Sequence, residues 1–425
     1  MLAGLGLLSG CSSSGANDSQ EQSAVKELKS TQTRVTPPSE EGMAAGLDEQ
    51  TFAFEFLQQL KPHENATFSP HSLSSAFAML TDAADGETLE EVAQTLAFST
   101  RGDAFQRSQD ALQLSLAKRN REAVDRSDEH VDAQILEQSN DLWMRDDAPP
   151  QESYLDTLAR YYGAGVHVAD FGHRPEEARV AINTKVATDT HQLLKDLIPQ
   201  GAIDPLTVAV LTNALYFKAP WQNQLGAPVT GDFHQLDGSV TSAPMLKTEQ
   251  RATYYTGDGF VATSLAYYGG DLEMAFIVPD AGAYDSVRAS LTGDTLAKIV
   301  SERSSELVEI TLPKFKLDNE VGATDALKAM GMSTPFDADK AEFPKLVSPM
   351  FDRVHISDVL HKATVAIDEK GTEAAAATAI LLAGNSSAPL EPPKPKVVTI
   401  DRPFLFVIRD NPTGAVLFVG QVVSP

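Results

Sequence analysis

Apolar residues in the first half of the chain recur at helical spacing. The first group is Phe52, Phe54, Phe56, Leu57 and Leu60. An amphipathic helix places residues three and four positions apart on one face, so this group predicts an opening helix. Similar apolar stretches predict further helices over residues 72–80, 88–96, 154–162 and 176–197.

The second half of the chain has patterns typical of strands. Apolar runs rich in Val, Leu and aromatic residues predict strands over residues 207–217, 272–278, 307–317, 404–408 and 415–423. The last two flank the turn signal Asn411-Pro412-Thr413-Gly414. Helices early and strands late indicate an α+β fold. Residues 46–425 show no internal repeat and no Pro/Gly-rich boundary, which favours one large domain over several.

The N-terminal region has a different composition. Residues 12–45 are rich in Ser, Gln, Glu, Thr and Pro, and such a segment buries too little apolar surface to offset the entropy of ordering. We therefore predict a flexible linker. Ahead of it, the apolar run 2–8 is too short to span a bilayer, and it ends in Leu8-Ser9-Gly10-Cys11.

That ending resembles the lipobox of bacterial lipoproteins. The resemblance implies a signal peptide over residues 1–11 and a lipid on Cys11, which would anchor a secreted protein to the cell envelope through the tether Ser12-Ser13-Ser14-Gly15. Ser12, where Asp would signal retention at the inner membrane, favours the outer membrane or cell surface. No Lys or Arg precedes the apolar run, which departs from the usual pattern. The alternative is a frayed terminus with a buried thiol.

Composition and missing motifs exclude several classes of function. With 59 acidic and 34 basic residues, the formal net charge is −25, which repels phosphate and argues against nucleic-acid binding. One cysteine cannot form an intramolecular disulfide. The chain has no Gly-x-Ser-x-Gly, no His-Glu-x-x-His and no phosphate-binding Gly-Lys-Ser, so we expect no enzyme, metal or cofactor.

Residues 371–400 do not fit their surroundings. They contain four consecutive alanines, then Thr378 to Leu382, then a proline cluster that begins at Pro389. By itself, the alanine run is compatible with a helix that Gly384 ends, because alanine has the highest helix propensity. A long connection without regular structure inside a compact domain instead points to a functional loop.

The flanking residues resemble the C-terminal signature of the serpin family. In that signature a strand ends in Glu-x-Gly-Thr-Glu-Ala-Ala, here residues 369–375, a reactive loop follows, and the chain re-enters the fold through Arg402-Pro403-Phe404. Residues 65–72, 212–221, 312–315 and 327–332 are similar to further serpin motifs, so the resemblance covers residues 47–425. Two motifs depart from the family pattern: the usual Thr-x-Gly-Lys-Ile is Thr190-His191-Gln192-Leu193-Leu194, and one glycine is missing near Gly86.

The resemblance implies a serpin fold and inhibition by a trapping mechanism. A protease would attack the loop and form an acyl-enzyme, and the cleaved loop would then enter the central sheet as a strand. In the implied hinge, Thr372 and residues 374–377 are small, which suits burial on an inserting strand, and Glu373 should face the exposed side. This favours an inhibitor over a non-inhibitory binding protein or protease substrate. The hinge comprises Glu369, Gly371, Thr372, Glu373, Ala374, Ala375, Ala376 and Ala377.

The resemblance also implies polar residues beneath the sheet. Ser69, Ser72, Asn213 and His361 match positions that form a polar latch, and Trp221 matches the position where the loop first enters the sheet. Without the resemblance, His361 is interpreted as a hydrogen-bonded histidine of the core, and Trp221 as an ordinary core residue.

Family spacing of sixteen residues from Glu369 places the scissile bond at Asn385-Ser386. No Lys or Arg lies between Gly371 and Pro393, so a trypsin-like enzyme lacks its preferred residue. Elastase-like or subtilisin-like proteases suit Leu381, Leu382 or Ala383, and an asparagine-directed protease suits Asn385. The implied partner is a serine protease held as a covalent acyl complex by a monomeric inhibitor.

Overall fold

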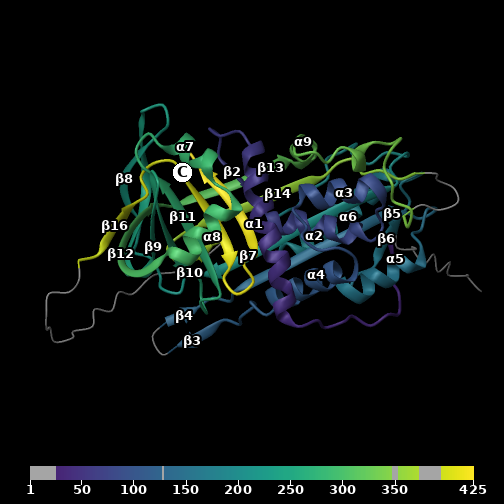
Figure 1. Cartoon of the computed structure of the whole chain (residues 1–425), viewed down its shortest axis with the longest axis horizontal. Coiled ribbons are helices and arrows are strands. Elements are labelled where there is room, and N and C mark those ends of the chain that lie inside the picture. Colours follow the sequence, from purple (N-terminus) through teal and green to yellow (C-terminus); the bar gives the residue numbers. More distant parts are fainter. Residues whose placement is uncertain (1–24, 127–128, 347–352, 373–393) are drawn as a thin grey trace, which may run out of the picture.

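The computed structural model describes residues 25–126, 129–346, 353–372 and 394–425 (Figure 1). Within these ranges the chain forms two large β-sheets, of seven and nine strands, with helices around them. Cys11, the hinge residues from Glu373 onward and the Asn385-Ser386 bond lie outside the described residues. The mixture of helices and mainly antiparallel sheets confirms the α+β prediction.

The seven-stranded sheet runs the length of the molecule. Its strands, in spatial order, are β1 (Val25–Leu28), β6 (Val166–Ala169), β5 (Ile135–Arg145), β7 (Ala209–Pro220), β15 (Gly371–Thr372), β14 (Leu360–Ile367) and β13 (Phe315–Gly322). Continuous ladders join β5 to β7 and β13 to β14. The two-residue strand β15 therefore stands between two well-formed halves of the sheet.

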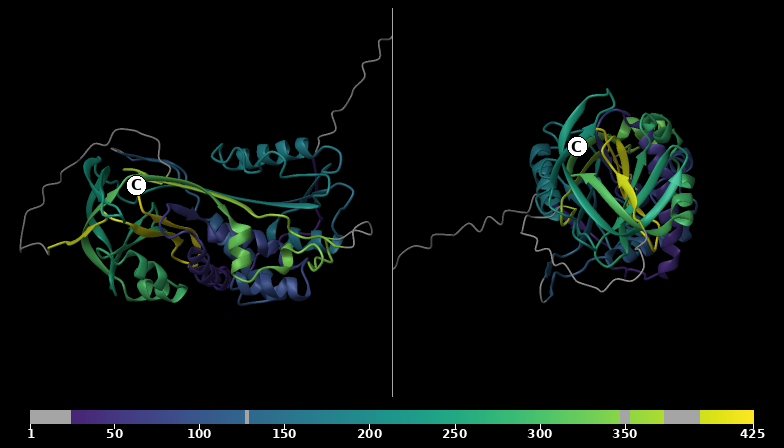
Figure 2. Two further views of the ribbon diagram at one scale, coloured as in Figure 1. Left: turned by 90° about the horizontal axis from the view of Figure 1, so that it is seen from above. Right: turned by 90° about the vertical axis from the view of Figure 1, so that its left-hand side faces the viewer.

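The two faces of this sheet pack against different partners. On β7, Leu215, Phe217 and Ala219 point into the core shared with the nine-stranded sheet, while Val210 and Ala214 point toward helix α6 (Pro175–Asp189). This is the two-residue period expected of a strand buried on both faces. Figure 2 (left) shows α6 lying over one face of the sheet, with the purple and blue N-terminal helices on the other.

The nine-stranded sheet provides most of the second core. Its order is β16 (Lys396–Thr399), β12 (Ser304–Pro313), β9 (Val240–Gly257), β10 (Phe260–Ala266), β11 (Leu272–Pro279), β17 (Phe404–Asp410), β18 (Val416–Val422) and β2 (Ala66–Phe68), with β8 (Val229–His234) paired to β9. A hairpin of β3 (Val124–Arg126) and β4 (Glu129–Val131) stands apart.

Helix α2 is the central helix. Ser69 caps it by accepting a hydrogen bond from the Ser72 amide, and Pro70 occupies its first turn, where no N–H is needed. All its residues are buried, which is typical of a helix packed on every side. The other helices are α1 (Gly42–Gln59), α3 (Gly86–Thr95), α4 (Gly102–Ala117), α5 (Glu152–Thr157), α7 (Tyr284–Ser290), α8 (Gly293–Glu302), α9 (Ala323–Ala329) and the short η1 (Ser39–Glu41), η2 (Leu158–Tyr162) and η3 (Thr334–Phe336). None of the helices in the described part of the chain is long and apolar enough to cross a membrane.

Two predicted elements have different bounds. The predicted helix 176–197 ends as α6 at Asp189, because His191 and Gln192 adopt the left-handed φ angles 49° and 68°. The predicted strand 307–317 is two strands, β12 and β13, which belong to different sheets. Pro313 ends β12, since it has no N–H to continue the ladder.

The prediction of a flexible linker over residues 12–45 was wrong from residue 25 onward. Residues 25–28 form β1 at the edge of the seven-stranded sheet, paired with β6, and α1 already begins at Gly42. Between them, Arg34 pairs with the buried carboxylate of Asp110 at 2.8 Å and the Val35 amide donates to the Arg160 carbonyl at 2.8 Å. These partners are far away in sequence, so the local composition gave no sign of them.

Candidate functional site

A tight turn connects β14 to β15. The Asp368 carboxylate accepts hydrogen bonds from the amides of Lys370 and Gly371, at 2.8 and 3.2 Å. The Asp368 amide donates to the Gly371 carbonyl at 2.9 Å, which closes the turn. The chain therefore folds back and starts a new strand immediately after β14 ends.

The new strand fits tightly between its neighbours. Gly371 pairs with Pro220 and Thr372 pairs with both Ala219 and Ile367. A Cβ added at Gly371 would lie 2.1 Å from the Ala219 carbonyl oxygen, so only glycine fits this position. Thr372 is 2% exposed, and its hydroxyl shares a hydrogen bond of 2.6 Å with the Tyr267 hydroxyl.

Trp221 covers the turn from the side of β7. Its indole N–H donates to the Asp368 carbonyl at 3.0 Å, and its amide donates to the Lys370 carbonyl at 2.7 Å. The indole stacks on the Tyr267 ring with centroids 4.6 Å apart and planes at 11°. Trp221 thus lies beside the turn between β14 and β15.

Glu369 ties the turn to the start of β13. Its carboxylate lies 3.1 Å from the Lys314 ammonium. Partial burial raises the pKa of Glu369, but backbone hydrogen bonding and Lys314 outweigh it and leave the pKa below its ordinary value. The carboxylate is therefore charged at neutral pH.

Beneath β15, the described strands β7 and β14 have no ladder between them. Near the boundary between β7 and β14, several buried polar atoms lack a hydrogen-bond partner, among them Asn213 Oδ1 on β7 and Ser72 Oγ on α2. A buried polar atom without a partner costs free energy, so this boundary suits an added group that brings hydrogen bonds.

The predicted latch residues lie around this boundary with the following contacts. The Ser69 amide donates to Nε2 of His361, at 2.9 Å, and this links α2 to β14. The Ser72 amide donates to Ser69 Oγ at 3.1 Å. Asn213 donates through Nδ2 to Oδ1 of Asn140 on β5, and no hydrogen bond joins Asn213 to His361 among the described residues.

His361 is neutral in this environment. It is 2% exposed, and burial lowers its pKa to about 4. The bond from the Ser69 amide requires an unprotonated Nε2, since a protonated nitrogen has no lone pair to accept it.

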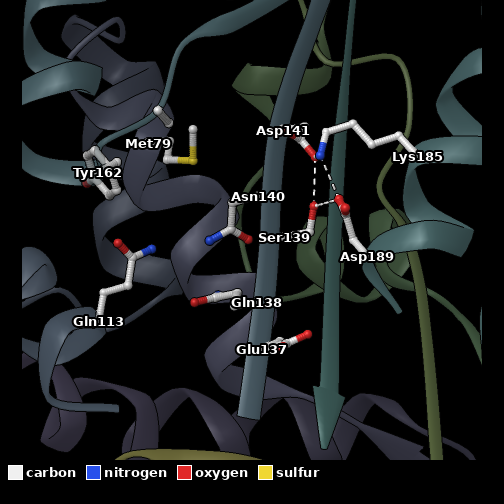
Figure 3. Close-up of a pocket in the computed structure, with 11 residues that line it drawn as sticks. Met79, Gln113, Glu137, Gln138, Ser139, Asn140, Asp141, Tyr162, Lys185 and Asp189 are labelled. Carbon is white, nitrogen blue, oxygen red and sulfur yellow. Dashed lines mark hydrogen bonds and ion pairs between the residues drawn. The ribbon is translucent and has the colours of Figure 1, made fainter. Parts of the chain in front are cut away.

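Helix α6 is fixed to the opposite face of β5 by charged groups (Figure 3). Lys185 lies 2.6 Å from Asp189 and 3.4 Å from Asp141. Burial raises the pKa of Asp141, but hydrogen bonds from His167 and Ser139 and the charge of Lys185 outweigh it and lower the pKa. Of the two ion pairs of Lys185, the one with Asp141 joins α6 to β5.

Sequence reasoning missed several residues of this region. Tyr267, which holds Thr372, lies in a stretch without a recognised motif, and Asp368 directly precedes the signature but was given no role. Asn140 and Gln138 on β5 were also missed, because no strand was predicted there. Alternation over 135–145 is weak, with mostly half-buried positions, so only the pairing with β7 identifies them.

Comparisons with known proteins agree with this geometry. The model of the serpin (serine protease inhibitor) family matches residues 48–425. The chain belongs to the serpin family. Serpins are generally protease inhibitors rather than enzymes. Among the described residues, no group of three or more His, Cys, Asp or Glu side chains could hold a metal ion.

Relatives of this chain include archaeal, mammalian and plant proteins. The chain is 32% identical to an uncharacterized serpin-like protein of Thermococcus kodakarensis, covering 88% of this chain and 84% of that protein. It is 30% identical to antithrombin-III of Homo sapiens, covering 88% and 80%. The structure of the thermophilic serpin tengpin in the native state superposes with a TM-score of 0.79 at 25% identity, covering 94% of this chain and 98% of that one.

Proposed function

We propose that this serpin is a suicide-substrate inhibitor of serine proteases, which traps the acyl-enzyme by inserting its cleaved loop between β7 and β14. The observation that carries the proposal is β15: the hinge residues Gly371 and Thr372 are already paired as a strand between these two. Insertion would continue a ladder that has already begun, so the first strand pairs of the inserted segment are already formed.

The register of β15 defines where each later residue would lie. Thr372 pairs with Ala219 and with Ile367, both antiparallel, so each step along the loop moves one residue back on β7 and β14. Six residues further, Thr378 would lie between Asn213 and His361. Its hydroxyl could donate to Asn213 Oδ1, which has no partner in the uncleaved protein.

The same register separates the inserting side chains by face. Thr372 points into the core, so Ala374, Ala376 and Thr378 would follow it inward, and Glu373 would point to the opposite face. The inward residues are small and uncharged, which suits a buried strand. Asn385 would reach the level of Leu206, beyond the far end of β7.

The expected motion is large enough to disable an enzyme. About 13 inserted residues at roughly 3.3 Å each would carry the attached protease on the order of 45 Å. Each ladder hydrogen bond contributes about 1 kcal/mol net, so a full strand with its apolar side chains would release more than about 10 kcal/mol.

We propose elastase-like or subtilisin-like targets, because the loop offers Leu381, Leu382, Ala383 and Asn385 but no Lys or Arg before Lys394. The test is incubation with pancreatic-type elastase, subtilisin and trypsin, followed by denaturing gels and mass spectrometry. We expect a denaturant-resistant band at the combined mass and cleavage at or near Asn385. A cut loop without a complex for all three enzymes would contradict inhibition and favour a non-inhibitory serpin.

A pair of hinge variants tests insertion directly. Ala374→Arg places a charge on the inward face, where burial without a partner is costly, so we expect cleavage with little or no complex. Glu373→Arg changes the neighbouring residue on the outward face and serves as the matched control. Retained trapping by Ala374→Arg, or equal loss in both variants, would contradict the register.

We also propose that Cys11 carries lipid and anchors a monomeric inhibitor to the outer membrane or cell surface. The support is the Leu8-Ser9-Gly10-Cys11 sequence followed by a Ser-rich stretch. The test is metabolic labelling with a fatty acid analogue in wild type and Cys11→Ser. Label in both variants, or in neither, would contradict the anchor.

A further inference from the structure

The first turn of α2 is bonded to both halves of the seven-stranded sheet. On one side, the Ser69 amide donates to His361 on β14. On the other side, Nε2 of His71 lies 3.1 Å from Oε1 of Gln138 on β5. Ser69 and His71 are two residues apart, and the boundary between β7 and β14 lies between their partners.

His71 is fixed from behind by a buried carboxylate. Its Nδ1 lies 2.7 Å from Oε1 of Glu49 on α1, and both side chains are 2% exposed. The second carboxylate oxygen accepts a hydrogen bond from the Val416 amide on β18, at 3.2 Å. The imidazole is therefore held to the body of the protein and cannot follow β5 if β5 moves.

The groups around His71 favour its protonated form. Burial lowers the pKa of His71, but Glu49, together with Gln138 and the more distant Asp410, outweighs burial and leaves the pKa above its ordinary value. Asp410 is itself paired, at 2.5 Å, with Arg119, which lies two residues after the end of α4. Protonated His71 donates through both nitrogens, to Glu49 and to Gln138.

Insertion of a strand conflicts with this arrangement. Neighbouring strands lie about 4.8 Å apart, so a full strand between β7 and β14 must widen the sheet by about that distance. The long ladder between β5 and β7 makes β5 move with β7. A helical turn does not stretch, so the bonds from α2 to His361 and to Gln138 cannot both persist.

We propose that the hydrogen bond from His71 to Gln138 is a tether that holds the β5 half of the sheet on α1 and α2 and slows loop insertion. The inference rests on the proposed function. Gln138 and His71 are positioning residues: they touch neither the loop nor the protease, and they set how readily the sheet opens.

The surroundings of Gln138 allow the tether to open. Figure 3 shows Gln138 and Asn140 pointing to the same side of β5 as Gln113 and Tyr162, into a cavity of about 400 Å³. Nε2 of Gln138 has no partner there. The carboxamide can therefore move away from His71 into a polar cavity, where water can hydrate it, so release costs little beyond the bond itself.

The test measures the rate of insertion in three variants of the full chain. After rapid cleavage of the loop by a protease that does not become trapped, insertion is followed as the gain of heat resistance. Gln138→Leu removes the acceptor, and we expect insertion about three to ten times faster. Gln138→Glu places a carboxylate against protonated His71, and we expect insertion slower by at least a similar factor. Gln113→Leu alters the same cavity but leaves the bond between His71 and Gln138 in place, and should match wild type.

The two substitutions at Gln138 must shift the rate in opposite directions. A shift in the same direction would indicate general destabilisation and overturn the tether, as would rates equal to that of Gln113→Leu. If the wild type never gains heat resistance after cleavage, the proposed function and the tether fall together. If the wild type inserts but the variants do not differ, the tether alone is wrong.

Discussion

His361 couples the sheet to α2 in only one protonation state. Its pKa falls from 6.5 to about 4 on folding, so the folded protein binds fewer protons than the unfolded chain between these values. The contribution of neutral His361 to the free energy of unfolding is therefore complete above pH 6.5. It falls by about 3 kcal/mol as the pH decreases toward 4.

We expect His361→Gln, which can accept the same amide bond without titrating, to depend less on pH over this range. The measurement is the urea midpoint of the uncleaved protein at pH 7 and pH 4.5. His71 has a raised pKa and contributes in the opposite direction, but it does so in both proteins and cancels in the comparison. Equal losses in wild type and variant would contradict the assignment.

Gln192, three residues after the end of α6, has a strained backbone conformation. Its φ of 68° lies in the left-handed region, where the resembling serpin motif has glycine. A side chain there costs about 1 kcal/mol relative to glycine, and the hydrogen bond from Gln192 Nε2 to the Ala187 carbonyl is long, at 3.3 Å.

Gln192→Gly should therefore raise the free energy of unfolding by about 1 kcal/mol, measured by denaturant titration. Lys195→Gly, in the same segment but outside the left-handed region, serves as the control and should lower stability. A loss of stability in both variants would show that the strain at Gln192 is offset by contacts of its side chain.

Among the elements, the segment from β1 to η1 joins parts of the fold that are otherwise separate. β1 extends the sheet beside β6, the Lys29 ammonium donates to the Gly163 carbonyl at 2.6 Å, and Arg34 reaches α4. The Asp110 side chain that Arg34 meets is fully buried. Burial raises the pKa of Asp110, and Arg34 opposes that increase.

Arg34→Ala should cost about 1–3 kcal/mol of stability, because it leaves a buried carboxylate without its cation. The lower end of this range takes account of the partial exposure of the Arg34 side chain. Arg107→Ala removes the half-exposed pair with Glu41 and should cost less, because exposed ion pairs contribute little to stability. Urea midpoints of the two variants compare them, and an equal loss would contradict a special role of Asp110.

The whole molecule should become more stable when its loop is cut. If the loop enters the sheet, a strand worth more than about 10 kcal/mol is added, and the thermal midpoint should rise by at least about 20 °C. Calorimetry of cleaved and uncleaved protein measures the change. Ala374→Arg, cleaved at the same bond, should show little or no increase; an equal increase would show that the heat resistance does not come from insertion.

At the scale of the whole molecule, the sequence alone indicated the protein family. The ordered motif from Glu369 to Ala377, followed by Arg402-Pro403-Phe404, indicated the family because its residues are contiguous, and the family comparison agrees. The helices of the first half were also predictable, since a helix makes its hydrogen bonds within a few residues and its burial pattern repeats locally.

Only the tertiary structure decided the contacts between distant residues. It placed residues 25–28 in a sheet although their composition resembles a linker, paired Asn213 with Asn140, and brought His71 between Glu49 and Gln138. Strand pairing and buried ion pairs join residues far apart in the chain, and nothing in the local pattern specifies the partner. The sequence by itself therefore determined the family and the character of the loop, and the fold determined which groups hold the sheet closed.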